Sequence, residues 1–111
     1  MTHEQSIDAL TVALDHEPLP AEQVVSGSPT TGSLVLEERA DGTEVGVWEM
    51  TPGTATDVEV DELFVVLAGS ATVTGIAEDP LVLAPGSVVT LVAGMRTTWT
   101  VRVTLRKLYV I

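Results

Sequence analysis

The chain has 111 residues and no cysteine, and its 16 acidic side chains outnumber 5 basic ones to give a formal net charge of −11. The length fits a single domain, and a hydrophobic fraction of 45% excludes an intrinsically disordered chain. The acidity argues against nucleic-acid and anionic-membrane partners, and the lack of cysteine excludes disulfides and thiol chemistry.

The amino-terminal segment predicts a cytoplasmic protein. Glu4 and Asp8 stand where a secretory signal peptide would be apolar. No apolar run approaches the length of a membrane span, about 18 residues. We therefore expect no membrane partner, and we interpret the acidic surface as one that keeps the protein in solution.

Residues 1–32 differ in composition from the rest, and we interpret them as an arm. Prolines and the stretch 26–28 (Ser-Gly-Ser) interrupt this segment repeatedly. Within it, apolar residues alternate over 10–14, which predicts a short strand, and a helix of one or two turns over 6–14 is the alternative. His3 and His16 both lie in the arm, where we expect them to be exposed to solvent.

From Gly32 onward the pattern is one of short strands without a helix. Valine and threonine dominate these segments, and glycine or proline-glycine turns separate them. Such regular spacing predicts an all-β barrel or sandwich over residues 33–111. The expected strands are 33–38, 44–50, 56–60, 62–68, 70–75, 80–84, 87–92, 96–103 and 105–111.

Alternation assigns the faces of the two most informative strands. In 62–68, Glu62 shares a face with Phe64 and Val66, so a carboxylate ends an apolar face. In 96–103, the arginines at both ends fall on the solvent side. The residues expected inside the barrel from this second strand are Thr97, Trp99, Val101 and Val103.

Basic residues gather near the carboxyl terminus. We expect Arg102 to point outward, and Arg106 and Lys107 to point to opposite faces of one strand, with Lys107 on the same face as Leu105 and Tyr109. Whichever of the two points inward then needs a partner. The expected role is solvation, or ion pairs between subunits with the acidic first half of the chain, and binding of an anionic substrate is the alternative.

These motifs, in this order, resemble a small single-domain cupin, and within the cupins the subfamily related to (S)-ureidoglycine aminohydrolase. The resemblance covers about residues 18–111. It implies a double-stranded β-helix, which is a jelly-roll barrel with an interior pocket, preceded here by the arm. The motifs are Gly46-Val47-Trp48, Pro52-Gly53, the acidic-capped strand 61–69, Pro85-Gly86, Trp99 and the ending 106–111.

The resemblance also implies where metal ligands would stand. In metal-binding cupins the first motif supplies two histidines and a glutamate, and the second motif supplies another histidine. Here the glutamate position falls on Glu62, the first two histidine positions fall within 55–58, and the last falls on Thr97. Because three of the four ligands are missing, we expect neither a metal ion nor another cofactor.

A carboxylate site for a hard cation is the alternative to this metal-free interpretation. Asp57, Glu59 and Asp61 precede Glu62, but alternation along one straight strand places them on the opposite face. A bend near Asp61 would be needed to bring one of them inward. We favour the interpretation that these residues form a charged strand edge.

Four residues are candidates for a ligand site. Glu62 is either a general acid or base, or a rim carboxylate that pairs with Arg96 or with a backbone amide, and we favour the structural role. Trp99 is a candidate for stacking on a planar ligand, whereas we interpret Trp48 as a core residue. The four candidates are Glu62, Phe64, Thr97 and Trp99.

Three functions stay open. The first, which we favour, is a cupin that binds a small molecule in its barrel without a metal ion. The second is an enzyme akin to ureidoglycine aminohydrolase, which hydrolyses a C–N bond; that chemistry is manganese-assisted in the family, and the missing ligands count against it. The third is a structural or regulatory oligomer whose barrel is packed shut. We also expect a homodimer, in which the arm and one sheet cover the neighbouring subunit.

Overall fold

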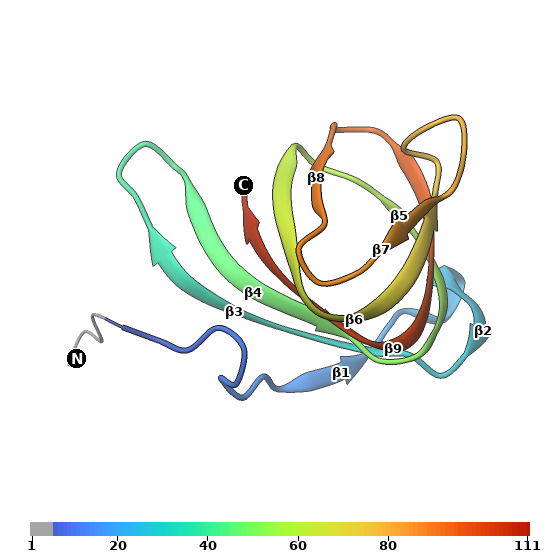
Figure 1. The fold of residues 1–111 in the computed structure, drawn as a ribbon, viewed down its shortest axis with the longest axis horizontal. Helices are drawn as coiled ribbons and strands as arrows, with labels where there is room; N and C mark the ends of the chain where they lie inside the picture. The colour runs from blue at the N-terminus through green and yellow to red at the C-terminus, as the bar shows by residue number, and fades with distance from the viewer. Residues whose placement is uncertain (1–5) are drawn as a thin grey trace.

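The computed structural model describes residues 6–111, which form nine strands in one strongly bent, antiparallel sheet (Figure 1). The jelly-roll-type barrel that the sequence predicts is confirmed. None of the helices in this range is long and apolar enough to cross a membrane. The elements are β1 His16–Pro18, the 3-10 turn η1 Ala21–Gln23, β2 Val24–Gly27, β3 Thr30–Glu38, β4 Glu44–Met50, β5 Gly53–Val58, β6 Glu62–Thr74, β7 Leu81–Leu83, β8 Val88–Leu91 and β9 Arg96–Val110.

Strand β9 organises the sheet because it pairs with three others. Its first half lies beside β5 and its second half beside β4, while β6 follows nearly its whole length on the other edge. β7 and β8 then extend the sheet from β6 and close the barrel. The β3–β4 hairpin and the end of β9 reach beyond the barrel, on the left of Figure 1.

The two longest strands correct the sequence-based segmentation. The breaks expected near Gly69 and Thr104 are absent, so 62–68 and 70–75 form one strand and 96–103 and 105–111 another. Register shifts occur instead between Val66 and Ala71 of β6, where the extra residue lies on β6 in the first shift and on β9 in the next two. The bulge turns Val103 to solvent at 60% exposure, although alternation placed it inside the barrel.

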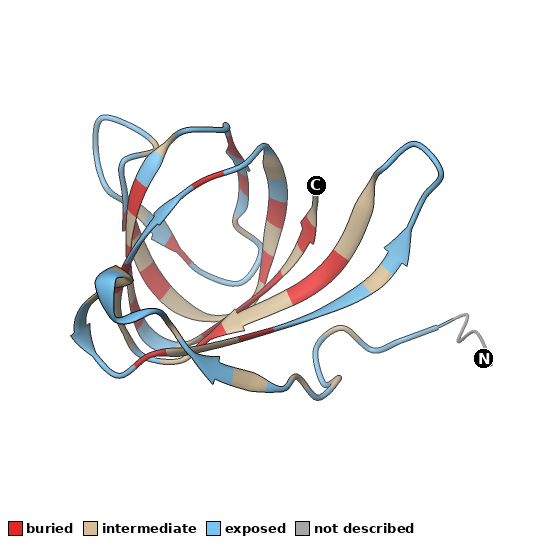
Figure 2. Ribbon diagram, turned by 180° about the vertical axis from the view of Figure 1, so that it is seen from behind, coloured by how far each residue is buried: buried red, intermediate tan, exposed pale blue. Residues whose placement is uncertain are grey.

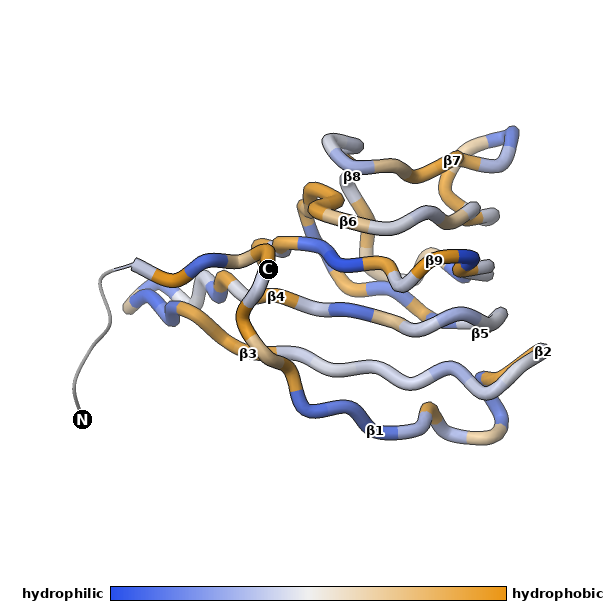
Figure 3. Tube along the Cα trace, turned by 60° about the horizontal axis from the view of Figure 1, so that its bottom comes forward, coloured by the Kyte–Doolittle hydropathy of each residue, from blue (hydrophilic) through white to orange (hydrophobic). Residues whose placement is uncertain are grey.

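The core lies inside the barrel and comes mainly from alternate positions of β6 and β9. Figure 2 shows buried segments recurring along these strands. In Figure 3, parts of β6 are hydrophobic, whereas β1, at the edge of the sheet, is hydrophilic. The alternation predicted for Phe64 and Val66, and for Trp99 and Val101, is confirmed, because all four are buried. The largest fully buried hydrophobic side chains are Phe64, Met50, Leu83, Leu91, Leu105, Val47, Val66, Val73 and Pro29.

The arm contains a turn where the sequence predicted a strand or a helix. Residues 10–14 form neither, and the strand of this segment is β1, which pairs with the edge of β3. The reason is local hydrogen bonding, since the Asp8 carboxylate accepts from the Leu10 amide and the Asp8 carbonyl accepts from the amides of Thr11 and Val12. β3 begins at Thr30, two residues before the boundary assigned to the arm.

The arm is fastened to the outer face of the sheet through buried charges. Arg106 donates from Nη1 to the carbonyls of Ala9 at 3.1 Å and Val12 at 2.8 Å, and from Nε to Glu49 at 2.9 Å. His16 bonds the other Glu49 oxygen at 2.6 Å. The expectation that His16 is solvent-exposed is therefore wrong, because its side chain is only 23% exposed. His3 lies outside the described residues.

We expect Glu49→Gln to weaken the attachment of the arm to the sheet and to change how the unfolding free energy depends on pH in acid. Burial opposes the charged form of Glu49, but hydrogen bonds from His16 and Arg106 outweigh it and hold the pKa below the ordinary value of 4.5. Because the folded-state pKa is the lower one, the stabilisation is present above the unfolded-state value and is lost as pH falls through the folded-state pKa. Glu49→Gln should cost about 1–3 kcal/mol at neutral pH.

Chemical denaturation of wild type and Glu49→Gln between about pH 7 and pH 3 measures this effect. The difference in unfolding free energy should narrow below the ordinary carboxyl pKa. Glu37→Gln is the control, because Glu37 also pairs with an arginine, Arg39, but both side chains are largely exposed. A difference for Glu49→Gln that stays constant over this pH range would contradict the assignment.

Gly69→Ala tests the bulge between β6 and β9. Gly69 has φ of +95°, and an added Cβ would collide with the carbonyl oxygen of Thr104. Gly42 has a similar φ of +92° but open space around it, so Gly42→Ala carries only the backbone penalty. We expect Gly69→Ala to lower the unfolding free energy by about 1–3 kcal/mol more than Gly42→Ala. Equal losses would show that the close approach of the strands is unimportant.

Candidate functional site

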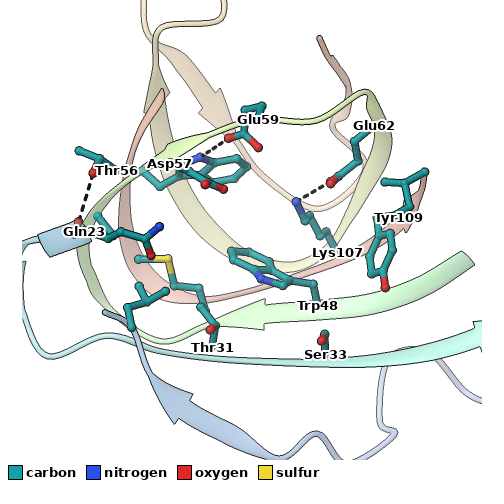
Figure 4. A pocket seen from close by; sticks show the side chains of 15 residues that line it. Gln23, Thr31, Ser33, Trp48, Thr56, Asp57, Glu59, Glu62, Lys107 and Tyr109 are labelled. Carbon is teal, nitrogen blue, oxygen red and sulfur yellow. Dashed lines mark hydrogen bonds and ion pairs between the residues drawn. The ribbon is translucent and has the colours of Figure 1, made fainter. Parts of the chain in front are cut away.

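A cavity of about 260 Å³ opens at the inner face of the sheet (Figure 4). Its floor comes from β3, β4 and β9, and its opposite wall comes from β5 and the connection to β6. The volume is slightly below the range of about 300–1,000 Å³ usual for drug-sized ligands. The lining residues are Leu19, Gln23, Thr31, Ser33, Trp48, Met50, Ala55, Thr56, Asp57, Glu59, Glu62, Trp99, Lys107, Tyr109 and Ile111.

Three carboxylates on the opposite wall come from one short stretch of chain. Asp57, Glu59 and Glu62 all line the cavity. The expectation that Asp57 and Glu59 lie opposite Glu62 is wrong, because β5 ends at Val58 and the chain bends before β6 begins. The sequence analysis considered an inward-facing carboxylate only in the alternative of a cation site, which required a bend near Asp61.

The bend is anchored to the β8–β9 turn. Glu59 donates its backbone amide to the carbonyl of Met95 and accepts at its own carbonyl from the amide of Gly94. The Asp61 carboxylate accepts from the Ala93 amide at 2.8 Å. These bonds replace a continued strand ladder, so Glu59 turns inward, whereas Asp61 stays exposed at the rim.

Glu59 is held by two donors and is only 7% exposed. Its Oε2 accepts from the Thr97 hydroxyl at 2.5 Å and from the Trp99 indole N–H at 3.2 Å. The interpretation of Glu59 as part of a charged edge is therefore wrong. Thr97, at the position where the resemblance expects a histidine, orients this carboxylate.

Lys107 lies inside the barrel at the centre of three aromatic rings. Its Nζ lies 4.5 Å from the ring centroid of Phe64, 4.6 Å from that of Trp48 and 5.1 Å from that of Trp99. It also donates to Glu62 Oε2 at 2.6 Å. The side chains of Lys107 and Glu62 are 6% and 12% exposed. The prediction that an inward-facing basic residue of this strand needs a partner is confirmed.

The predicted partner of Glu62 was wrong. Arg96 is exposed at the start of β9, whereas Lys107 lies in register with Trp48 on one side and Val66 on the other. Lys107 therefore points to the same side of the sheet as Glu62. Arg106, its neighbour, points to the other face, as alternation predicts.

The four residues proposed as a ligand site divide into two pairs. Glu62 and Trp99 line the cavity. Phe64 is 1% exposed and Thr97 is 2% exposed, so both lie behind the lining, where they contact Lys107 and Glu59 respectively. Trp48, interpreted as a core residue, packs against the core and also lines the cavity.

Two further side chains, Asp57 and Tyr109, have raised pKa values. Burial, followed by repulsion from Glu59, raises the pKa of Asp57 above its ordinary value. Burial, together with a hydrogen bond to Glu44 at 2.8 Å, raises the pKa of Tyr109. The Tyr109 ring fits because Gly46 lies opposite it, where any Cβ would collide with the ring.

Within 6–111, no three histidine, cysteine, aspartate or glutamate side chains are placed to hold one metal ion. Glu62 meets the Lys107 ammonium, and Glu59 meets Thr97 and Trp99. Both carboxylates are therefore committed to protein donors through one oxygen each.

Comparison with known proteins identifies a family. The model of the EutQ-like cupin domain matches residues 37–109. No curated protein matches the chain. The comparisons give no support to the narrower resemblance to the ureidoglycine aminohydrolase-like subfamily.

Solved structures share the fold. A protein of unknown function from Pseudomonas syringae pv. tomato superposes with a TM-score of 0.79 at 25% identity, over 94% of this chain and 46% of that one. This chain thus spans about half the length of that relative. EutQ from Clostridium difficile superposes with a TM-score of 0.70 at 19% identity, covering 95% and 83% of the two chains. A putative ethanolamine utilization protein Q from Salmonella typhimurium gives 0.61 at 16% identity, covering 90% and 95%.

Lys107→Met should be strongly destabilising, because it leaves the buried Glu62 carboxylate without its partner. We expect a loss of about 3–5 kcal/mol in unfolding free energy. Adding Glu62→Gln to Lys107→Met should recover much of that loss, since the uncompensated charge is then gone. A double-mutant cycle by urea denaturation measures the coupling, and additive losses would contradict a direct interaction.

Proposed function

The chain belongs to the family of EutQ-like cupin domains, and we propose that its barrel binds a small, positively charged molecule without the help of a metal ion. The observation that carries this proposal is the charge of the cavity. Asp57, Glu59 and Glu62 line it together with a single cation, Lys107. One ammonium compensates one of three carboxylates, so the cavity attracts cations and repels anions.

Hydrogen-bonding capacity supports the same proposal. Lys107 neutralises Glu62 directly, whereas Asp57 and Glu59 have no cationic side chain bonded to them among residues 6–111. Burial is the largest cause of the raised pKa of Asp57, and repulsion from Glu59 adds to it. An ammonium or guanidinium group placed between these two carboxylates would supply the missing charge.

The size and the apolar part of the lining narrow the ligand. The cavity of about 260 Å³ suits a small molecule, and the Trp48 ring offers an apolar face at its floor. A relative's name mentions ethanolamine utilization. Ethanolamine is a small amine of suitable charge, and we include it among the first ligands to test.

Two alternatives from the sequence carry less support. A C–N hydrolase akin to ureidoglycine aminohydrolase would use Glu62 as acid or base, but one oxygen of Glu62 is bonded to Lys107 and no metal-ligand set lies within residues 6–111. A structural or regulatory oligomer with a closed barrel conflicts with the open cavity. The homodimer expected from the sequence is retained as a proposal.

We expect ethanolamine and guanidinium to raise the melting temperature of the protein, and acetate at equal ionic strength to leave it unchanged. Asp57→Asn and Glu59→Gln should each weaken amine binding about tenfold in isothermal titration calorimetry, because each removes a charge-assisted hydrogen bond. Glu78→Gln, at an exposed position remote from the cavity lining, is the matched control. A larger shift with acetate than with the amines would overturn the proposal.

Amine binding should strengthen as pH rises. An ammonium ligand binds the ionised form of Asp57, and burial and Glu59 raise the pKa of that carboxyl above its ordinary value of 3.8. Affinity should therefore increase as pH rises through the raised pKa and level off above it. Calorimetry between about pH 4 and pH 8, where amines stay protonated, measures the profile. Asp57→Asn should flatten it and Glu78→Gln should not; a wild-type affinity independent of pH would exclude Asp57 from the site.

A further inference from the structure

The carboxylates of the cavity lie across from a set of hydrogen-bond donors, which bears on what the ligand carries besides a positive charge. The carboxylates come from the single stretch 57–62, which supplies Asp57, Glu59 and Glu62. Donors lie across the floor. Figure 4 shows Ser33 and Trp48 on the side of the cavity away from Glu59 and Asp57.

The donors form one row because of strand register. Ser33 on β3 is the direct partner of Trp48 on β4, and Trp48 is the direct partner of Lys107 on β9. Side chains at paired positions point to the same face of a sheet, so a hydroxyl, an indole N–H and an ammonium stand side by side. We name Ser33, Trp48 and Lys107 the donor row.

The donor row has unused capacity. In the part of the chain that the structure describes, neither the Ser33 hydroxyl nor the Trp48 indole N–H has a hydrogen-bond partner. Lys107 directs one of its three ammonium protons to Glu62 and keeps the others next to the aromatic rings and the cavity. These groups are not sealed away, since no side-chain donor or acceptor among residues 6–111 is both fully buried and unpaired.

The acceptor wall also has unused capacity. Asp57 uses Oδ1 for the neighbouring Val58 amide at 2.8 Å, and Glu59 uses only Oε2 for Thr97 and Trp99. The second oxygen of each carboxylate has no protein partner in residues 6–111. An amine at this end and an acceptor at the other would satisfy both sets of groups at once.

We propose that the ligand is a small amino carboxylate, whose ammonium group binds Asp57 and Glu59 and whose carboxylate binds the donor row. This inference rests on the proposed function and adds the second recognition element. A carboxylate alone meets the repulsion of Asp57 and Glu59, and an amine alone leaves the donor row to water. A molecule with both groups gains the second interaction at a much smaller entropic cost than a separate molecule would.

The test compares three molecules with three carbon atoms each, which are β-alanine, propylamine and propionate, by isothermal titration calorimetry on the full chain. β-Alanine should bind at least about tenfold more tightly than propylamine, which corresponds to about 1.4 kcal/mol for the second contact. Propionate should not bind measurably. Glycine and γ-aminobutyrate, run alongside, determine which spacing between the two charged groups fits best.

A double variant, Ser33→Ala with Trp48→Phe, assigns the effect to the donor row. Phenylalanine keeps an aromatic ring and removes the N–H, so the ratio of the β-alanine and propylamine affinities should fall toward one. Thr104→Ala, at a position outside the cavity lining, should leave the ratio unchanged. The melting temperature and circular dichroism of each variant verify its fold.

The outcomes separate this inference from the proposed function. If propylamine binds as tightly as every amino carboxylate tested, the inference is wrong, but the proposal that the cavity binds amines still holds. A tenfold advantage that survives the double variant would also overturn the assignment to the donor row. Failure of all amines and amino carboxylates to bind would overturn the proposed function, and this inference with it.

Discussion

Two adjacent basic residues on β9 hold this structure together by pointing in opposite directions. Arg106 lies on the outer face, where it pairs with Glu49 and binds carbonyls of the arm. Lys107 lies on the inner face, where it pairs with Glu62 among three aromatic rings. Burying charge is costly unless it is paired and fully hydrogen-bonded. Each residue therefore fixes its carboxylate in one position, the first to attach the arm and the second to shape the cavity.

The bend between β5 and β6 is the second constraint, and it explains why the cavity is acidic. A straight strand would place Asp57 and Glu59 on the face opposite Glu62. Hydrogen bonds from residues 59 and 61 to the β8–β9 turn interrupt the strand instead. Three carboxylates then face one space, where burial, followed by repulsion from Glu59, raises the pKa of Asp57. The acidity of the site is thus a consequence of backbone geometry as much as of composition.

The sequence predicted the barrel well because its signals are local. Alternation of apolar residues and turn glycines revealed most strands, and the burial of Phe64 and Trp99 followed from parity alone. The site depended on distant pairings that parity does not encode. Lys107 and Glu62 are 45 residues apart, and their contact depends on the register of β9 against β6 and on the bulge near Gly69. Glu59 was misassigned because a single bend reversed its direction.

Glu62 stands where the cupin resemblance implies a metal ligand, and in this structure it pairs with a basic side chain of the same chain. That resemblance places Glu62 at the position of the family's ligand glutamate, and here its cationic partner is the ammonium of Lys107 at 2.6 Å. Thr97, at a histidine position, likewise serves a carboxylate, that of Glu59. A positive charge supplied by the chain cannot exchange, and it carries protons that a ligand can accept. The barrel therefore keeps a cation beside its glutamate, whereas Asp57 and Glu59 have no cationic side chain bonded to them within residues 6–111, and the proposed amine site rests on this difference.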